Sequence, residues 1–211
     1  MQLHLSIFFY LMKFMFPFLA VVVLCSACTK YRNQASIPDN NTVPTNGNIV
    51  FGSLRINEFI CKGVNTKAQT YFQGSDAKWF ELYNPTNNNI TLESGHWFIT
   101  DSLEEANKFS IPQNPSGNQW TVPAKGFLAI MCLKTTSIPC PSKINSTFSL
   151  SSTEGAIGIF YKPDSLSALI AIDTIRYSFP SGALSGISYG RIPNGEGPII
   201  QLTDVSPEAS N

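Results

Sequence analysis

The sequence predicts an all-β fold, on three observations. From Ser53 onward, short stretches of alternating apolar and polar residues recur, as in strands with one buried face. The chain carries 14 Gly and 14 Pro, residues that interrupt helices and form turns. No stretch keeps the apolar period of an amphipathic helix. Many short strands separated by turns are typical of a β-sandwich or a barrel.

Seven segments carry the strand pattern. Residues 54–60 (LRINEFI) alternate between apolar and polar, and 78–83 (KWFELY) do so until an Asn-Pro pair ends them. Residues 97–100 and 109–111 are short apolar runs bounded by Gly and Pro. The one helical candidate, 102–107, is too short and too polar to stand alone. Three later segments combine β-branched and aromatic residues between turns, namely 126–131, 156–161 and 168–177.

The first 27 residues have the organisation of a signal peptide. The apolar run 7–24 contains Lys13, and a charge near the middle of a membrane span is costly. Taken from Met12, the segment has a short basic start, an apolar stretch at 14–24 and small residues suited to cleavage. We therefore expect residues 1–27 to be a signal peptide, with Met12 a candidate for the true start.

Cys28 follows the expected cleavage site directly. Residues 24–28 (LCSAC) resemble the lipobox of bacterial lipoproteins, in which a Cys after small residues receives lipid and becomes residue one. Cys25 departs from that pattern, which usually has Leu or another aliphatic residue there. The resemblance implies lipidation of Cys28, and Thr29 after it implies passage to the outer membrane. An ordinary cleaved signal and an uncleaved anchor are the alternatives.

Residues 28–52 predict a flexible tether. Asn, Pro, Thr, Ser and Gly dominate 36–47, and no apolar period appears there. No acidic cluster follows Cys28, and such clusters help export to the cell surface in some bacteria. The sequence is therefore compatible with a domain that faces the periplasm and with one that faces outward.

The low charge content and the lack of a basic surplus argue against a nucleic-acid partner. Only 13% of the residues are charged, about half the roughly 25% usual for soluble domains. Residues 53–211 carry 11 basic and 13 acidic side chains, a net charge of −2. Binding to nucleic acid needs a basic surplus. We therefore expect no nucleic-acid partner.

Seven short motifs mark the globular part in a fixed order. They are 56–59 (INEF), 79–85 (WFELYNP), 95–101 (GHWFITD), 122–128 (VPAKGFL), 148–150 (FSL), 155–161 (GAIGIFY) and 188–191 (SYGR). The ordered set resembles lamin-tail domains. The resemblance covers about residues 53–211 and implies one immunoglobulin-like β-sandwich. That family has no common enzymatic activity to carry over.

Three segments depart from the lamin-tail pattern. They are the long stretch 62–75, the polar insertion 114–119, and 132–141, which is bounded by Cys. Insertions on a sandwich usually form loops, where binding sites often lie. We expect 62–75 and 132–141 to contact a partner.

The sequence offers no complete catalytic or metal-binding set. Residues 186–190 (GISYG) match the G-x-S-x-G elbow of serine hydrolases, but turn residues follow them and no His does. His96 is the one His beyond the signal peptide and lacks companion ligands for a metal. Asp101, Glu104 and Glu105 do not have the spacing of a calcium loop. We therefore expect no enzyme, no metal and no cofactor.

Glu58 and Glu81 stand inside predicted strands. Alternation places Glu58 on the apolar face of 54–60, the expected core face. A carboxylate there needs a partner or a shifted pKa. We expect Arg191, whose guanidinium can pair bidentately, to form a structural ion pair with these two residues. Ligand binding by the group is the alternative.

Three cysteines remain if Cys28 carries lipid. Export places them in an oxidising compartment, where disulfides persist. Cys132 and Cys140 bracket a short loop, whose closure is worth about 2.5 kcal/mol. We expect that disulfide, with Cys61 left as an odd thiol that competes for either partner.

Trp120 lies in a polar loop and is the candidate for stacking on a sugar ring, although Trp packs into cores more often. Solvent-exposed coplanar rings would favour a glycan ligand, and buried rings would favour protein contacts. We expect a lipid-anchored envelope lipoprotein with a non-catalytic binding, adhesion or scaffolding module. The alternative is a carbohydrate-binding module that uses exposed aromatic rings.

Overall fold

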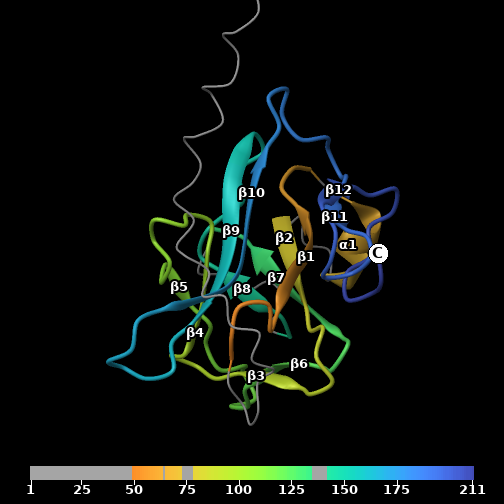
Figure 1. Cartoon of the computed structure of the whole chain (residues 1–211). Helices are drawn as coiled ribbons and strands as arrows, with labels where there is room; N and C mark the ends of the chain where they lie inside the picture. Colours follow the sequence, from red (N-terminus) through yellow and green to blue (C-terminus); the bar gives the residue numbers. More distant parts are fainter. Residues whose placement is uncertain (1–48, 64, 73–77, 135–141) are drawn as a thin grey trace, which may run out of the picture. The chain divides into compact units, whose positions relative to one another are not determined.

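The computed structural model describes residues 49–63, 65–72, 78–134 and 142–211. Within these residues it places twelve β-strands and one six-residue α-helix (Figure 1). All of them belong to one compact unit, Pro44–Asn211. The predicted all-β class is therefore confirmed, whereas the predicted signal peptide and most of the predicted tether lie outside the described residues.

The larger sheet has six strands in the order β12-β11-β1-β2-β7-β8. Its neighbours run antiparallel except β7 and β8, which are parallel. The strands are β1 (Arg55–Ile60), β2 (Lys78–Tyr83), β7 (Phe127–Cys132), β8 (Ile144–Ser146), β11 (Tyr189–Arg191) and β12 (Ile199–Gln201).

The second sheet has four strands in the order β10-β9-β4-β5, and a two-stranded ribbon pairs β3 with β6. All of these pairs are antiparallel. The strands are β3 (Ile90–Leu92), β4 (Trp97–Thr100), β5 (Phe109–Ser110), β6 (Trp120–Val122), β9 (Glu154–Tyr161) and β10 (Ile170–Ser178).

The two large sheets share one hydrophobic core. Phe59, Phe80 and Ile130 from the six-stranded sheet belong to the same buried cluster as Trp97 and Ile159 from the four-stranded sheet. Each large apolar side chain buried in this way contributes about 1.5–3 kcal/mol to folding. The arrangement is therefore sandwich-like, with the apolar faces of two sheets turned toward each other.

A second, smaller core covers the outer face of the six-stranded sheet. Helix α1 (Thr66–Tyr71) begins after Asn65, whose side-chain oxygen accepts hydrogen bonds from the first-turn amides of Lys67 and Ala68. Ala68 packs with Trp79 of β2 and with Val205 from the segment 202–211, which we call the C-terminal segment. Figure 1 shows α1, β11, β12 and the C-terminus gathered on one side of the domain.

The strand predictions and the structure agree within two residues at each end for all seven predicted strands. Residues 102–107 form turns, as their length suggested. Helix α1 was missed inside the predicted loop 62–75, although Asn65 is a recognisable N-cap. The strands that were missed have three residues each, too few to show a period. They are β3, β6, β8, β11 and β12.

A β-bulge in β1 corrects the predicted orientation of Glu58. The register against β2 shifts between Ile56 and Glu58, so one extra residue, Asn57, is inserted there. Leu54 and Ile56 therefore face the main core, whereas Glu58 and Ile60 face the outer side of the sheet. The prediction that Glu58 lies on the main core face is wrong, because a bulge reverses the alternation.

The C-terminal segment packs so closely on the sheet at Gly190 of β11 that a side chain there has little room. A Cβ there would stand 2.7 Å from the carbonyl oxygen of Asn57 and 2.8 Å from the side-chain nitrogen of Asn211. We expect Gly190→Ala to lower the free energy of unfolding by about 1–3 kcal/mol in urea titrations. Ser110→Ala, at an exposed position, should change it by less than about 0.5 kcal/mol. Equal stability of the two variants would contradict this packing.

Candidate functional site

Two glutamates meet on the outer face of the six-stranded sheet. Glu58 of β1 stands directly opposite Glu81 of β2 in the register. Both residues are 0% exposed, because the C-terminal segment lies over them. Like charges placed opposite each other in a sheet repel, so this pair needs hydrogen-bond donors nearby.

The donors come from the C-terminal segment and from the bulge. The backbone amide and the hydroxyl of Ser206 donate to Glu58, at 3.3 and 2.9 Å. The backbone amide of Glu208 donates to Oε2 of Glu81 at 2.5 Å, and Nδ2 of Asn57 donates to Oε1 at 3.1 Å. These bonds fasten the C-terminal segment to the sheet.

Further polar contacts hold the same segment. The Glu208 carboxylate accepts a hydrogen bond from the amide of Ala129 at 3.0 Å and pairs with Lys143 at 3.3 Å. Nδ2 of Asn211 donates to the carbonyl oxygens of Asn57 and Arg191. The segment is therefore an integral layer of the domain.

Burial raises the pKa of both glutamates. Loss of water raises the pKa of Glu58, whereas its hydrogen bonds to Ser188 and Ser206 act to lower it. Burial raises the pKa of Glu81 well above its usual value, and the neighbouring Glu58 adds to that effect. Among the described residues, no Lys or Arg lies within 4 Å of either carboxylate.

Arg191 does not pair with these glutamates, so the predicted ion pair of Glu58, Glu81 and Arg191 is wrong. Gly190, the neighbour of Arg191, is the β11 residue opposite Glu58. Since successive side chains of a strand alternate between faces, Arg191 points to the other side of the sheet. There its Nη2 lies 3.7 Å from Oδ2 of Asp173 in β10.

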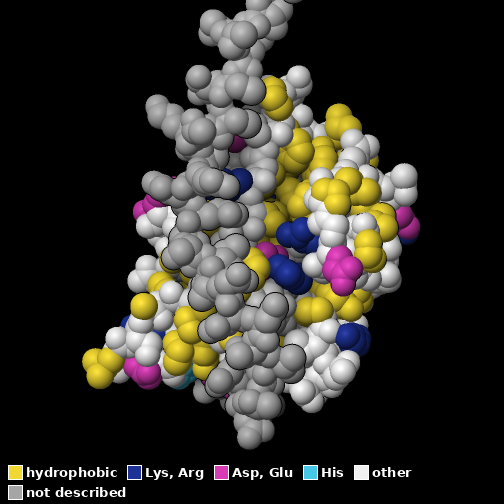
Figure 2. Space-filling view, in the orientation of Figure 1, with side chains coloured by type: hydrophobic (Ala, Val, Ile, Leu, Met, Phe, Trp, Pro, Cys, Tyr) yellow, Lys and Arg dark blue, Asp and Glu magenta, His cyan; other side chains and the backbone are white. Residues whose placement is uncertain are grey.

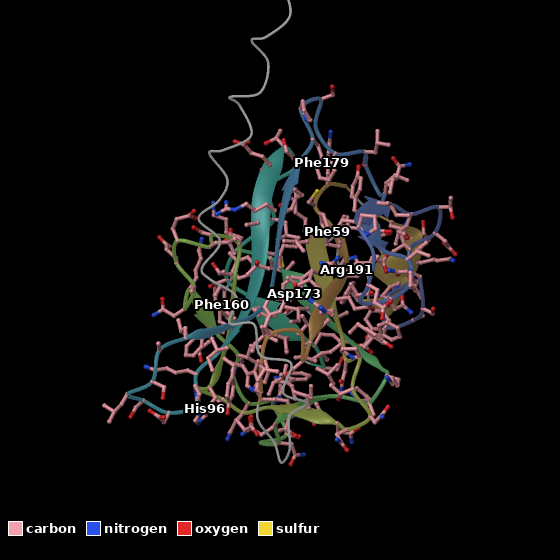
Figure 3. All side chains as sticks on the ribbon, viewed as in Figure 1. Phe59, His96, Phe160, Asp173, Phe179 and Arg191 are labelled. Atoms are coloured by element: carbon pink, nitrogen blue, oxygen red, sulfur yellow. The ribbon has the colours of Figure 1, made fainter. Side chains whose placement is uncertain are left out.

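Asp173 is the centre of a second charged cluster, at the junction between the two sheets. It stands at a register shift in β10 and is 2% exposed. Its Oδ2 accepts a hydrogen bond from the amide of Ile56, beside the β1 bulge, at 2.8 Å. Burial raises the pKa of Asp173, while the guanidiniums of Arg191 and Arg55 act in the opposite direction. Figure 3 shows Asp173 and Arg191 close together at this junction.

The tryptophans do not form an exposed platform. Trp79 and Trp97 are 0% exposed. Trp120 is half-buried in β6 against the main core, and its ring nitrogen is buried without a hydrogen-bond partner among the described residues. The ring of Trp120 is therefore largely used in packing.

The other catalytic and metal candidates also have structural roles. His96 contacts the carbonyl oxygen of Lys162 through Nδ1 at 2.8 Å and stacks on Tyr161. Ser188, the serine of the G-x-S-x-G match, is buried, and its hydroxyl donates to the carbonyl oxygen of Asp204 at 3.4 Å. Within the described ranges, no three His, Cys, Asp or Glu residues are grouped to hold a metal.

Cys61 and Cys132 are buried in the main core, and neither is bonded to another cysteine among the described residues. Burial raises the pKa of Cys61 to about 11 and that of Cys132 to about 12, so neither is a reactive thiolate at neutral pH. Cys140 and Cys28 lie outside the described residues. The disulfide between Cys132 and Cys140 and the lipid on Cys28 therefore stay predictions.

Sequence reasoning missed the groups that hold these sites together. Asp173 was detectable as a charge inside the apolar run 168–177. Asn57, Ser206 and Glu208 gave no such signal, because their roles depend on the bulge and on the return of the C-terminal segment.

Comparisons with protein-family models, with curated proteins and with solved structures give no match for this chain. In the part of the chain that the structure describes, no helix has the length and apolar character to cross a membrane.

The raised pKa values of Glu58 and Glu81 predict a pH dependence of stability. A raised pKa means that the folded chain binds the proton more tightly than the unfolded chain. The stabilisation is complete below the usual value of 4.5 and is lost as the pH rises through the folded pKa. We expect the free energy of unfolding to increase as the pH is lowered from about 8 to about 5.

Glu81→Gln should flatten this pH profile, since it removes one of the titrating groups. The matched control is Glu196→Gln at an exposed site, which should keep the slope of the unmodified protein. Urea unfolding at several pH values measures both. Identical slopes for the unmodified protein and Glu81→Gln would refute a raised pKa at this position.

Proposed function

We propose that this chain is a lipid-anchored envelope lipoprotein whose domain is a non-catalytic module that binds another protein. Its fold is proposed to be the immunoglobulin-like sandwich of lamin-tail domains. The ordered motifs support this, as does the core that two β-sheets share. The lipobox-like LCSAC sequence supports the lipid on Cys28.

The observation that carries the binding proposal is that the fold itself uses the buried polar side chains that could otherwise act in catalysis. Glu58 and Glu81 accept hydrogen bonds from the C-terminal segment, and Asp173 is held by the amide of Ile56 and two arginines. Ser188 donates to a backbone carbonyl. An acid–base or nucleophilic mechanism needs a side chain that can reach substrate. The described residues thus favour binding through the surface.

A protein partner is favoured over a glycan. Sugar-binding platforms need exposed aromatic rings, and the rings of Trp79 and Trp97 are fully buried. Half-buried Trp120 alone supports the carbohydrate alternative. Loop 62–75 is in part committed to the second core through α1, so it offers less surface to a partner than its length suggested.

The proposed location is the outer membrane, because Thr29 rather than Asp follows the lipidated Cys. A tether of about 24 residues can hold the domain clear of the bilayer. The proposal applies equally to a domain that faces the periplasm and to one that faces outward.

Lipid attachment can be tested with two matched cysteine variants. We expect Cys28→Ser to abolish incorporation of labelled palmitate and to move the protein out of the membrane fraction. Cys25→Ser should retain both, because the expected acyl acceptor is intact. Unchanged labelling of Cys28→Ser, or loss of labelling in Cys25→Ser, would contradict lipidation at Cys28.

Binding can be tested with the full-length lipoprotein in detergent micelles. We expect it to retain a specific envelope protein after chemical cross-linking, and not to bind immobilised glycans or DNA. Trp120→Ala should leave the protein contact unchanged. Binding to a glycan that Trp120→Ala abolishes would overturn the protein-binding proposal in favour of the carbohydrate alternative.

A further inference from the structure

Arg55 lies at the start of β1, where its side chain is held at the surface. The residues before it are fixed, since the amide of Gly52 donates to the carbonyl oxygen of Ile172 at 2.7 Å. The ring of Phe51 lies 5.3 Å from the centre of the guanidinium, a cation–π distance. The aliphatic part of Arg55 passes close to Gly195. These neighbours restrict the side chain before any partner binds.

Among the described residues, few groups accept hydrogen bonds from the guanidinium of Arg55. Within the described part of the chain, its guanidinium forms the contact with Phe51 and an ion pair with Asp173 at 3.6 Å. Its neighbour Arg191 differs, because Nε and Nη1 donate to the carbonyl oxygens of Ile56 and Gly197. A guanidinium has five N–H donors in a planar fork that matches a carboxylate. Arg55 therefore has donors left for a ligand.

The charge around Arg55 is unbalanced. Two guanidiniums share the single carboxylate of Asp173, which leaves a net charge of +1 in this cluster. The Arg55 side chain is 31% exposed, so part of that charge reaches solvent.

Apolar side chains border the same cluster. Phe51, against Arg55, is 43% exposed, and Ile192, next to Arg191 in the chain, is 51% exposed. In Figure 2 the central dark-blue side chains border a band of hydrophobic ones. A charge with unused donors beside exposed apolar groups suits a partner that offers both an anion and an apolar side chain.

We propose that Arg55, together with Phe51, binds an acidic side chain of a partner protein that carries an aromatic or aliphatic residue beside it. This rests on the proposed function and names the contact site on the domain. A carboxylate carries one negative charge, which matches the net charge of +1. A phosphate would add a second charge close to Asp173, and its hydrated oxygens would gain nothing from Phe51.

The test is a titration of the full-length lipoprotein in detergent micelles, with arginine side chains observed by ¹⁵N NMR. The probe is the peptide N-acetyl-Glu-Phe-amide, compared with N-acetyl-Gln-Phe-amide and with inorganic phosphate. We expect the Glu peptide to shift the Nε–H signal of Arg55 and to bind about tenfold more tightly than the Gln peptide.

Three variants accompany the titration. Arg55→Met should abolish binding of the Glu peptide, and Arg55→Lys should weaken it, because Lys keeps the charge and loses the fork. Arg176→Met is the matched control. Arg176 is an exposed arginine of β10, in the four-stranded sheet, and it pairs with Glu104. This variant should bind as the unmodified protein does. A cooperative urea unfolding transition shows that each variant is folded.

Equal binding of the Glu and Gln peptides, tighter binding of phosphate, or an equal effect of Arg176→Met would overturn the proposal. The proposed function can fail separately. If a cross-linked envelope protein is retained equally by Arg55→Met, this site is wrong while the protein-binding function stands. If the Glu peptide binds at Arg55 and no envelope protein is retained, the site stands without that function.

Discussion

Asn57 occupies the bulge of β1, and its side chain joins Glu81 of β2 to the turn at Gly195. Its amide group donates to Glu81, and its oxygen accepts a hydrogen bond from the amide of Gly195 at 2.8 Å. The extra residue turns Glu58 toward Glu81 on one face of the sheet. On the other side, the amide of Ile56 bonds Asp173 across to the second sheet. One inserted residue thus determines the position of both charged clusters.

The two clusters balance their charges in different ways. On the outer face, neutral backbone and hydroxyl donors satisfy Glu58, and the pKa of each glutamate is raised because no cation lies beside it among the described residues. Between the sheets, two guanidiniums surround Asp173. Burying ionisable groups costs free energy, and hydrogen bonds of this kind offset the cost. The clusters fix the positions of β10 and of the C-terminal segment on the six-stranded sheet.

The strands longer than three residues could be predicted from the sequence, whereas five strands of three residues could not. Residues 78–83 are rich in aromatic residues, end at an Asn-Pro pair and agree with β2 at both ends. The three residues of β11 carry no period, so the alternation that sends Gly190 and Arg191 to opposite faces was not visible. Without that alternation, the sequence predicts an ion pair of Arg191 with the two glutamates, whereas Arg191 pairs with Asp173. The bulge at Asn57 leaves no mark on composition, so the face of Glu58 was also assigned wrongly.

The return of the C-terminal segment has a consequence for the order of events during synthesis. Glu58 and Glu81 leave the ribosome early in the domain, whereas their donors at Ser206 and Glu208 follow 148 and 127 residues later. Until then, the outer face of the central sheet presents two uncapped carboxylates and an incomplete apolar cluster. Chain termination or proteolysis before Ser206 would leave that face open even if every strand had formed. Residues 206–208 therefore complete the cover of the two glutamates.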